Sequence, residues 1–395
     1  MITLREKICY SLGDFANNII IVLLPISLGI TLGFSPVVIG SFMLGSFIVV
    51  SIFSDLYIGY ITDKIKHTKF GSSRYCLLIF SIPAAILGII LFIPHITLPT
   101  SLQYIIFFII HMIIYPFLNL PYSVLNAKIT DDKKERFELN IFRMGGAVVM
   151  MILTFLFVSL NVMTPASIIL VGSLPLLYLA VFLGTKERVK FESNYTLKDI
   201  PQIFTKAYIL TFLSYAILVL RRSIFLTLLV FGGLISPAAF LYSLLIGLVI
   251  CYFFAKKINK ETLLDFSNYT SILVLLALFI GLSISAPTIF ITICLAFSGF
   301  LLAIHAAVAF PMVMDTIYEN KNILAPRWAL IETSRKLGEI VIAPFMVSYF
   351  LGGSILASLP LFIFGTILFN IIMIIITQLW KLNIRKIEIL GYQNS

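Results

Sequence analysis

Charged side chains are scarce in this chain of 395 residues. They make up only 12% of the sequence, whereas hydrophobic residues make up 60%. Soluble domains carry about 25% charged and about 45–50% apolar residues, so this composition cannot cover a surface that faces water. It therefore excludes a soluble enzyme, a nucleic-acid-binding module and a disordered tail, and it predicts a polytopic membrane protein.

Several motifs that carry chemistry are also missing. The four cysteines, Cys9, Cys76, Cys251 and Cys294, form no C-x-x-C pair and have no zinc spacing. The sequence contains no P-loop, no Gly-rich dinucleotide turn, no His/Cys/Glu metal cluster and no G-x-S-x-G motif. We therefore expect no enzyme activity, no cofactor, no metal site and free thiols. Any transport would draw its energy from an ion or substrate gradient.

Twelve apolar runs are long enough to cross a membrane. A spanning helix needs about 20 mostly apolar residues. Barrel strands are excluded because the runs are too long and too uniformly apolar. No cleavage site follows the basic start of the first run, so we expect a retained helix and not a signal peptide. The runs cover residues 10–33, 36–60, 74–93, 102–127, 138–160, 166–184, 207–232, 237–255, 267–285, 288–314, 327–350 and 354–379.

Lysine and arginine occur in alternate loops between these runs. The loops at residues 64–74, 128–136, 186–206, 256–260 and 321–327 are basic, and those between them contain neither residue. Basic loops face the cytoplasm. Both termini are also basic, so we expect a cell-membrane protein with both termini in the cytoplasm. The net charge of +10 then reflects this orientation and contact with anionic lipid, with no nucleic-acid partner.

The longest polar stretch divides the twelve runs into two sets of six. We expect residues 1–184 to form an N-terminal six-helix bundle, residues 185–206 a cytoplasmic linker, and residues 207–395 a C-terminal six-helix bundle. Basic loops follow the second and fourth runs of each half, which favours two related halves. We expect an all-α monomer in the lipid bilayer that handles a small-molecule substrate.

Polar side chains within the runs are the candidates for function. A charge at the bilayer centre costs about 2.5–3.5 kcal/mol on insertion scales, so it is retained where it has a role or a partner. Asp14, Asn17 and Asn18 share one helix face through their i, i+3 and i+4 spacing. The other candidates are Ser51, Ser54, Asp55, Asn119, Ser123, Asn140, Arg143, Arg221, Arg222, His305, Asp315, Glu332, Arg335, Lys336 and Glu339.

Several of these candidates also have a purely structural interpretation. Glu332 is spaced to pair with Arg335 and Lys336 on its own helix. Asp55 can be anchored by the nearby basic loop. Arg143 lies five residues inside its run, so its side chain can reach the cytoplasm by snorkelling.

Arg221 and Arg222 lie near the middle of the seventh run, too deep for both to snorkel. At least one of them should face a cavity or a partner acid such as Asp14 or Glu332. In the cavity, Arg221 and Arg222 would join other cations and bind a carboxylate or phosphate. This interpretation favours an anionic substrate such as a uronide.

Two sets of residues resemble known transporter motifs. Gly59-Tyr-Ile-Thr-Asp63-Lys64 resembles the G-x-x-x-D-R/K loop of the major facilitator superfamily. Residues 10–18, 54–59, 119–143 and 309–338 resemble the glycoside–pentoside–hexuronide:cation symporters, the melibiose-carrier family. That resemblance implies two six-helix bundles around a central cavity, alternating access, and symport of a sugar or glycoside with sodium, lithium or a proton.

The resemblance also implies roles for individual residues. The acids of the family's cation site fall on Asp55 and Ser51, with Ser54 between them. Asp14 can supply a second acid, and the depleted set suits a proton better than sodium. Substrate would bind at Asn18, Asn119, Arg143 and Lys336, with Arg221 and Arg222 adding positive charge. Asp63, Lys64 and Arg136 would lock the cytoplasmic gate. An exporter or a carrier of lipids or other amphiphiles is the alternative function.

Overall fold

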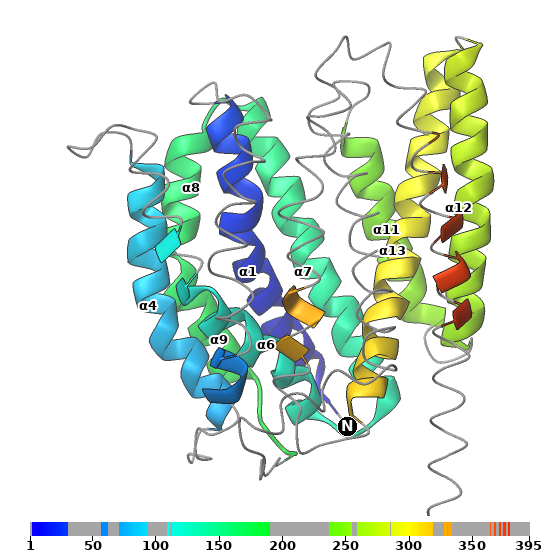
Figure 1. Ribbon diagram of the computed structural model, residues 1–395. Coiled ribbons are helices and arrows are strands. Elements are labelled where there is room, and N and C mark those ends of the chain that lie inside the picture. Colours follow the sequence, from blue (N-terminus) through cyan, green and yellow to red (C-terminus); the bar gives the residue numbers. More distant parts are fainter. Residues whose placement is uncertain are drawn as a thin grey trace, which may run out of the picture. The chain divides into compact units, whose positions relative to one another are not determined.

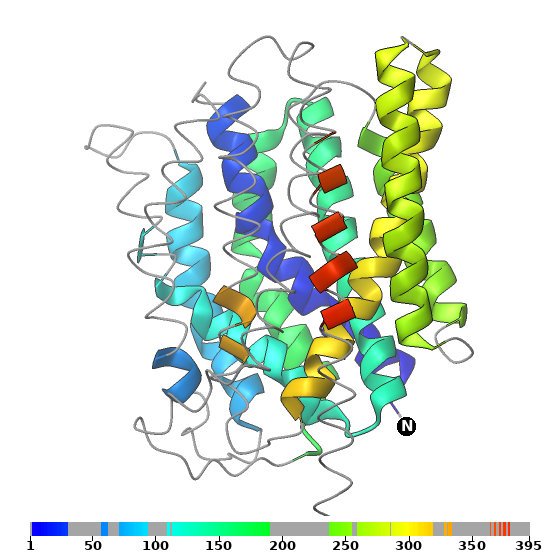
Figure 2. The same cartoon turned by 45° about the vertical axis from the view of Figure 1, so that its right-hand side comes forward.

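The computed structural model describes about half of the chain. The described residues are 2–30, 57–61, 71–93, 109–110, 113–189, 237–254, 259–284, 286–318, 328–329, 331–333 and short stretches between 364 and 379. Within these ranges the chain forms helices joined by short turns, without strands (Figures 1 and 2). The predicted all-α class is therefore confirmed.

The chain divides into two compact units. The N-terminal unit comprises residues 1–195 together with residues 320–333, and the C-terminal unit comprises residues 196–319 and 334–395. A short piece of the eleventh predicted run thus belongs to the unit that the first six runs form. The predicted boundaries at residues 184 and 206 remain a prediction.

Six long helices of the N-terminal unit are described. Helix α1 packs against α7 and α9, and α4 packs against α6, α8 and α9 (Figure 1). Their bounds are α1 Leu4–Ile30, α4 Ser72–Phe92, α6 Pro116–Ile129, α7 Lys133–Ser159, α8 Met163–Gly172 and α9 Leu174–Gly184.

Local sequence explains where these helices begin. Helix α6 starts at Pro116, where the missing N–H of proline costs no helical hydrogen bond. The carboxylate of Asp132 caps α7 by accepting hydrogen bonds from the backbone N–H groups of Lys134 and Glu135, at 2.7 Å and 2.9 Å. The sixth predicted run is divided into α8 and α9 at Ser173, because Pro175 cannot donate a helical hydrogen bond.

Helices α1 and α7 approach each other closely at a glycine. A side chain at Gly146 would bring its Cβ to 2.2 Å from the backbone oxygen of Ser11. The neighbouring Gly145 faces open space, where a Cβ would meet no atom within 4 Å. Gly146 therefore sets the distance between the two helices that carry Asp14 and Arg143.

The C-terminal unit contains three long described helices, α11 (Pro237–Phe254), α12 (Lys260–Ser283) and α13 (Thr288–Tyr318). Helix α13 packs against both α11 and α12. Nδ1 of His305 on α13 lies 3.3 Å from the hydroxyl of Ser267 on α12 and links the two helices. Lys260 donates to Asp315 at 3.0 Å and joins the ends of α12 and α13.

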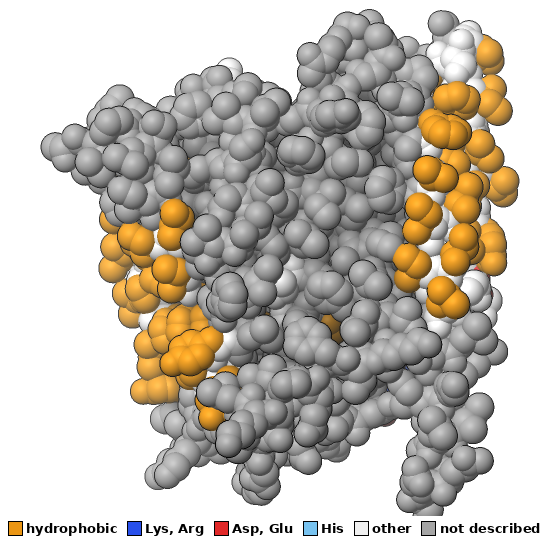
Figure 3. Space-filling model, viewed as in Figure 1, with side chains coloured by type: hydrophobic (Ala, Val, Ile, Leu, Met, Phe, Trp, Pro, Cys, Tyr) orange, Lys and Arg blue, Asp and Glu red, His pale blue; other side chains and the backbone are white. Residues whose placement is uncertain are grey.

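Six described helical spans are long and apolar enough to cross a membrane, when α8 and α9 are counted together as the span Met163–Gly184. Hydrophobic side chains cover the visible faces of α4 and of α12 and α13 in Figure 3. On α12 the exposed apolar residues recur every three or four positions, as on a helix side that faces lipid: Phe266, Tyr269, Leu273, Leu276 and Ile280. The predicted polytopic membrane protein is confirmed, and α7 starts five residues earlier than the predicted run at 138.

Candidate functional site

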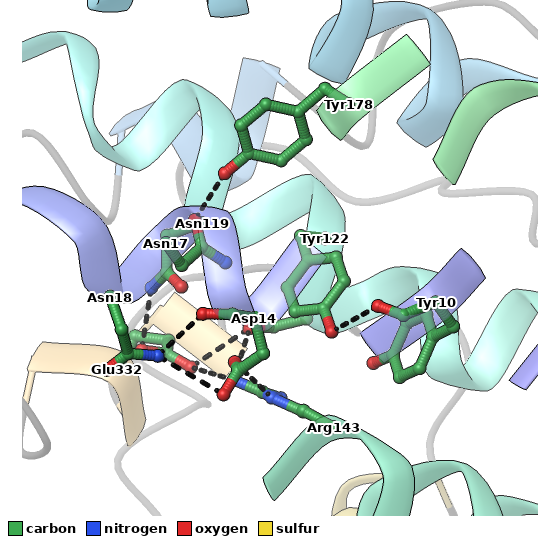
Figure 4. Close-up of polar contacts among 10 residues, drawn as sticks. Tyr10, Asp14, Asn17, Asn18, Asn119, Tyr122, Arg143, Tyr178 and Glu332 are labelled. Carbon is green, nitrogen blue, oxygen red and sulfur yellow. Dashed lines mark hydrogen bonds and ion pairs between the residues drawn. The ribbon is translucent and has the colours of Figure 1, made fainter. Parts of the chain in front are cut away.

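Buried polar side chains gather in the interior of the N-terminal unit (Figure 4). We call them the central polar cluster. They come from three helices and from the short segment 331–333, and each is less than 5% exposed. The members are Asp14 and Asn18 of α1, Asn119 and Ser123 of α6, Arg143 of α7, and Glu332.

An ion pair between α1 and α7 forms the first half of the cluster. The guanidinium Nε of Arg143 donates to Oδ1 of Asp14 at 2.8 Å. Asn18 lies one turn further along α1, and its amide donates to the backbone oxygen and to Oδ2 of Asp14, at 2.7 Å and 3.3 Å. Arg143 is only 1% exposed, so the alternative in which it snorkels to the cytoplasm is wrong.

Glu332 forms the second half of the cluster. The amide of Asn119 donates to Oε2 of Glu332 at 2.7 Å, and the hydroxyl of Ser123 donates to Oε1 at 3.0 Å. Nη2 of Arg143 lies 3.8 Å from the same Oε1 and 3.4 Å from the Ser123 hydroxyl. Arg143 therefore lies between two carboxylates, that of Asp14 from the first half of the sequence and that of Glu332 from the second half.

Tyrosine rings form one wall of this cluster. The rings of Tyr10 and Tyr122 are stacked with their centroids 4.8 Å apart, and the guanidinium of Arg143 lies 5.3 Å from the centroid of Tyr122. The Tyr122 hydroxyl donates to the backbone oxygen of Tyr10 at 2.8 Å, and the Tyr178 hydroxyl donates to Asn17 at 2.6 Å. The wall fixes the guanidinium in one orientation through a cation–π contact.

The donors and acceptors of the cluster are of the kinds that bind oxygen-rich small molecules. The guanidinium of Arg143 is a charged donor with fork geometry, which suits carboxylates and other oxyanions. The amides of Asn18 and Asn119 can both donate to and accept from hydroxyl groups, and the hydroxyl of Ser123 can do the same. The members are less than 5% exposed, and a hydrogen bond in such buried surroundings is electrostatically stronger than it would be in solution.

The structure brings together four of the predicted site residues. Asp14, Asn18, Asn119 and Arg143 lie in one cluster, although the sequence assigned Asp14 to the coupling ion and the others to substrate. Arg136 is described and buried in the first turn of α7, where its Nη1 donates to the backbone oxygen of Asp131 at 2.9 Å. The remaining predicted residues lie outside the described part of the chain: Ser51, Ser54, Asp55, Asp63, Lys64, Arg221, Arg222 and Lys336.

The sequence indicated Glu332 as a polar candidate within an apolar run, but it did not assign Glu332 to substrate or to the coupling ion. Its spacing suggested pairing with Arg335 and Lys336 of the same helix, and these two residues lie outside the described part. The contact with Asn119 joins positions 213 residues apart, which no helical spacing can indicate. The remaining signal was the acidic side chain itself, placed within an apolar run.

A second group of ion pairs, which we call the terminal ion pairs, lies at the basic-loop end of the N-terminal unit. Arg188 donates to both carboxylate oxygens of Glu6 at 2.9 Å, and this bond raises the pKa of Arg188 above its ordinary value. Lys7 pairs with Glu138. Lys128, which was counted in a basic loop, instead lies buried in the last turn of α6. It donates to the hydroxyls of Ser72 and Ser73, at 2.8 Å and 2.9 Å.

The fold is that of the major facilitator superfamily. The proton:xylose symporter XylE aligns with a TM-score of 0.67 at 11% sequence identity, over 96% of this chain and 94% of that one. The Escherichia coli fucose:proton symporter FucP aligns with a TM-score of 0.65 at 14% identity, over 93% of this chain and 97% of that one. At these identities the likeness shows the twelve-helix fold alone, and it confirms the predicted fold.

The chain belongs to the family of MFS/sugar transport proteins, whose model matches residues 9–322. The uncharacterized symporter YjmB of Bacillus subtilis is 31% identical over 155 residues, which are 37% of this chain and 33% of that protein. A candidate sulfoquinovose importer of Salmonella typhimurium is 26% identical over 163 residues, 38% of this chain and 33% of that one. The chain thus spans about a third of the length of these curated relatives. The family and the structural neighbours are transporters and not enzymes.

Proposed function

We propose that the protein is a secondary transporter that carries a sugar, glycoside or sugar acid across the cell membrane together with a proton. Membership of the MFS/sugar transport family and the major-facilitator fold support transport by alternating access. The observation that carries the proposal is the central polar cluster, in which Asp14, Arg143 and Glu332 are buried among apolar helices.

Buried charges of this kind are expensive to keep for stability alone. Replacing a buried ion pair by apolar residues is often neutral or stabilising, because desolvation of both charges offsets their attraction. Ionisable residues inside membrane-spanning helices typically mark substrate or ion pathways. The central polar cluster therefore supports a binding site for a polar solute better than it supports a purely structural role.

The donors in the cluster suit a sugar. Asn18, Asn119 and Ser123 offer neutral groups for hydroxyls, and Arg143 offers a charged group for an oxyanion. Lys336, Arg221 and Arg222 are proposed to add positive charge. One of the relatives is a candidate importer of sulfoquinovose, a sugar that carries a sulfonate, which supports testing sugar acids beside neutral sugars.

Coupling to a proton is proposed at Asp55, with Ser51, Ser54 and Asp14 nearby. A proton needs a single carboxylate, whereas sodium needs several oxygen ligands, and this sequence offers serines where the related family has further ligands. Asp63, Lys64 and Arg136 are proposed to close the cytoplasmic gate. We also propose that both termini face the cytoplasm and that the protein acts as a monomer in contact with lipid.

Uptake by proteoliposomes tests this function. The purified chain is reconstituted and supplied with labelled glucose, glucuronate, sulfoquinovose or a fluorescent phospholipid, under an imposed proton or sodium gradient. We expect uphill uptake of at least one sugar with the proton gradient, and loss of uphill uptake with retained exchange in Asp55→Asn. Uptake driven by sodium and independent of pH would contradict proton coupling. Movement of phospholipid without any sugar would favour the amphiphile carrier instead.

A further inference from the structure

A side chain of the protein itself occupies donors of the proposed binding site. Both oxygens of the Glu332 carboxylate accept hydrogen bonds, one from the amide of Asn119 at 2.7 Å and one from the hydroxyl of Ser123 at 3.0 Å. The side chain is fully buried, and the guanidinium of Arg143 is 3.8 Å away. Figure 4 shows Glu332 facing these groups.

This arrangement resembles the way a protein holds a carboxylate ligand. An amide, a hydroxyl and a guanidinium from two helices converge on one oxyanion, and charge-assisted hydrogen bonds of this kind are short and strong. The donors belong to α6 and α7, whereas Glu332 belongs to a segment almost 190 positions further along the sequence. The carboxylate of Glu332 therefore reaches these donors from a separate segment of the chain, as a bound ligand would reach them from outside.

The distances show which contacts of Arg143 would survive the departure of Glu332. The close ion pair of Arg143 is with Asp14, at 2.8 Å, and Asn18 supports that carboxylate from the same helix. Glu332 is held mainly by its two neutral donors, with the guanidinium at a longer distance. Removing Glu332 would thus leave the pair between Asp14 and Arg143 intact, and an incoming anion would restore the charge that was lost.

We propose that Glu332 holds the place of the negatively charged group of the substrate, and that a sugar with a carboxylate or sulfonate displaces it. This inference rests on the proposed function, because it assigns Asn119, Ser123 and Arg143 to substrate. Exchange of one anion for another keeps the charge of the cluster constant. A neutral sugar cannot make that exchange, so Glu332 selects for sugar acids.

The charged and titratable groups that face Glu332 come from the helices packed around it. Arg143 of α7 is the nearest, and Asp14 of α1 lies on the other side of that guanidinium. Tyr122 of α6 stacks under the guanidinium. Among the described residues, the guanidinium of Arg143 therefore faces the Asp14 carboxylate on one side and, on the other, either the Glu332 carboxylate or the substrate.

The variant Glu332→Gln tests the proposal on the full-length protein in detergent or nanodiscs. Glutamine keeps the shape and one accepting oxygen for Asn119 but removes the competing charge. Binding is measured for glucose, glucuronate and sulfoquinovose, which share one ring and differ at carbon 6. We expect the two acids to bind about tenfold more tightly to the variant than to the parent, since a hydrogen-bonded charged competitor is lost. The affinity for glucose should stay unchanged.

Two controls match this substitution. Thr333→Val changes the adjacent buried residue, whose hydroxyl donates to the backbone oxygen of Ala329 in its own turn. Glu138→Gln removes another buried carboxylate that pairs with a lysine, Lys7, outside the cluster. Neither control should change the ratio of acid to glucose affinity.

Tryptophan fluorescence reports the displacement directly. Trp328 is buried one turn before Glu332, and the chain contains one other tryptophan, Trp380. In a Trp380→Phe background, glucuronate should shift the emission of Trp328 in the parent and much less in Glu332→Gln, where the charge exchange no longer occurs. A purely structural Glu332 predicts no such shift.

The outcomes separate this inference from the proposed function. If the parent binds sugar acids but Glu332→Gln binds them equally or more weakly, the displacement proposal fails and the transporter proposal stands. If neither protein binds any sugar while both unfold at the same temperature, both proposals fail. If Glu332→Gln and Glu332→Asp both unfold at lower temperature and lose binding, Glu332 is a structural partner and the proposal is overturned.

Discussion

The N-terminal unit contains two arginine ion pairs, Arg143 with Asp14 and Arg188 with Glu6, that differ in their access to water. In the central polar cluster, the side chains of Arg143 and Asp14 are 1% and 5% exposed. Among the terminal ion pairs, the side chain of Arg188 is 44% exposed although its partner Glu6 is buried. The two ion pairs have similar geometry but contribute differently to stability. Water screens the pair of Arg188 with Glu6 and does not screen the pair of Arg143 with Asp14.

The difference indicates what each pair does. The pair of Arg188 with Glu6 joins the start of α1 to the residues after α9, at an exposed position where a modest contribution to stability is sufficient reason to keep it. The central polar cluster bears a large desolvation cost inside apolar helices. The proposed binding of a polar solute would explain its persistence, and this contrast predicts how variants of the two ion pairs should behave.

The largest effect is expected for Arg143→Ala. It leaves the Asp14 carboxylate buried without its close partner, which typically costs about 3–5 kcal/mol of unfolding free energy. Sugar binding should be lost as well. Arg143→Lys keeps the charge but not the guanidinium fork, so it should recover part of the stability without restoring binding. Thermal unfolding and binding of the purified variants measure both effects, and unchanged sugar binding in Arg143→Ala would contradict the assignment of the site.

The second prediction concerns the approach of α1 and α7. Gly146→Ala places a Cβ against the backbone of Ser11, so the helices must separate, at a cost of about 1–3 kcal/mol for overpacking. Gly145→Ala is the matched control, because a Cβ there meets open space. The unfolding temperature should fall for Gly146→Ala only. Equal behaviour of the two variants would show that the close approach does not position Asp14 and Arg143.

The third prediction concerns the helix cap at Asp132. Hydrogen bonds from the backbone N–H groups of Glu135 and Lys134 lower the pKa of Asp132 below its ordinary value. A lowered native pKa stabilises the fold above the ordinary pKa, and this stability is lost as the pH falls through the lowered value. Asp132→Ala should cost about 1 kcal/mol at neutral pH. Asp132→Asn should retain the cap and lose this part of the acid dependence, as measured by thermal unfolding across pH.

The smallest effect is expected for Arg188→Gln. Ion pairs with an exposed partner contribute about 0.2–1 kcal/mol, and salt screens them. The loss should therefore be small at low ionic strength and smaller still in high salt, with sugar binding unchanged. A large loss of stability in Arg188→Gln would remove the contrast between the two ion pairs.

The sequence predicted the fold more fully than the site. Apolar runs of spanning length are a strong signal, so the described helices were expected. The division of the sixth run was not predicted, and it arises because Pro175 cannot donate a helical hydrogen bond. The grouping of Asp14 with Asn18 followed from helical spacing. Their meeting with Asn119 and Arg143 was expected only through the family resemblance.

The role of Glu332 could not be predicted in the same way. Spacing within one helix relates a residue only to its near neighbours, and it therefore suggested a local ladder with Arg335 and Lys336. The contact with Asn119 and Ser123 depends on how a segment from the second half of the sequence packs into the N-terminal unit. That packing depends on the shapes of many side chains at once and leaves no periodic trace in the sequence.

Protection of a cysteine in the central polar cluster tests the central claim most directly. Ser123→Cys is nearly isosteric, and the four native cysteines can be replaced by alanine or serine. If the cluster is the transport site, a transported sugar should slow the reaction of Cys at position 123 with a small maleimide. The same sugar should leave a cysteine at the exposed position of Ser159 unaffected. A protein that transports sugar while position 123 reacts at an unchanged rate would contradict the account.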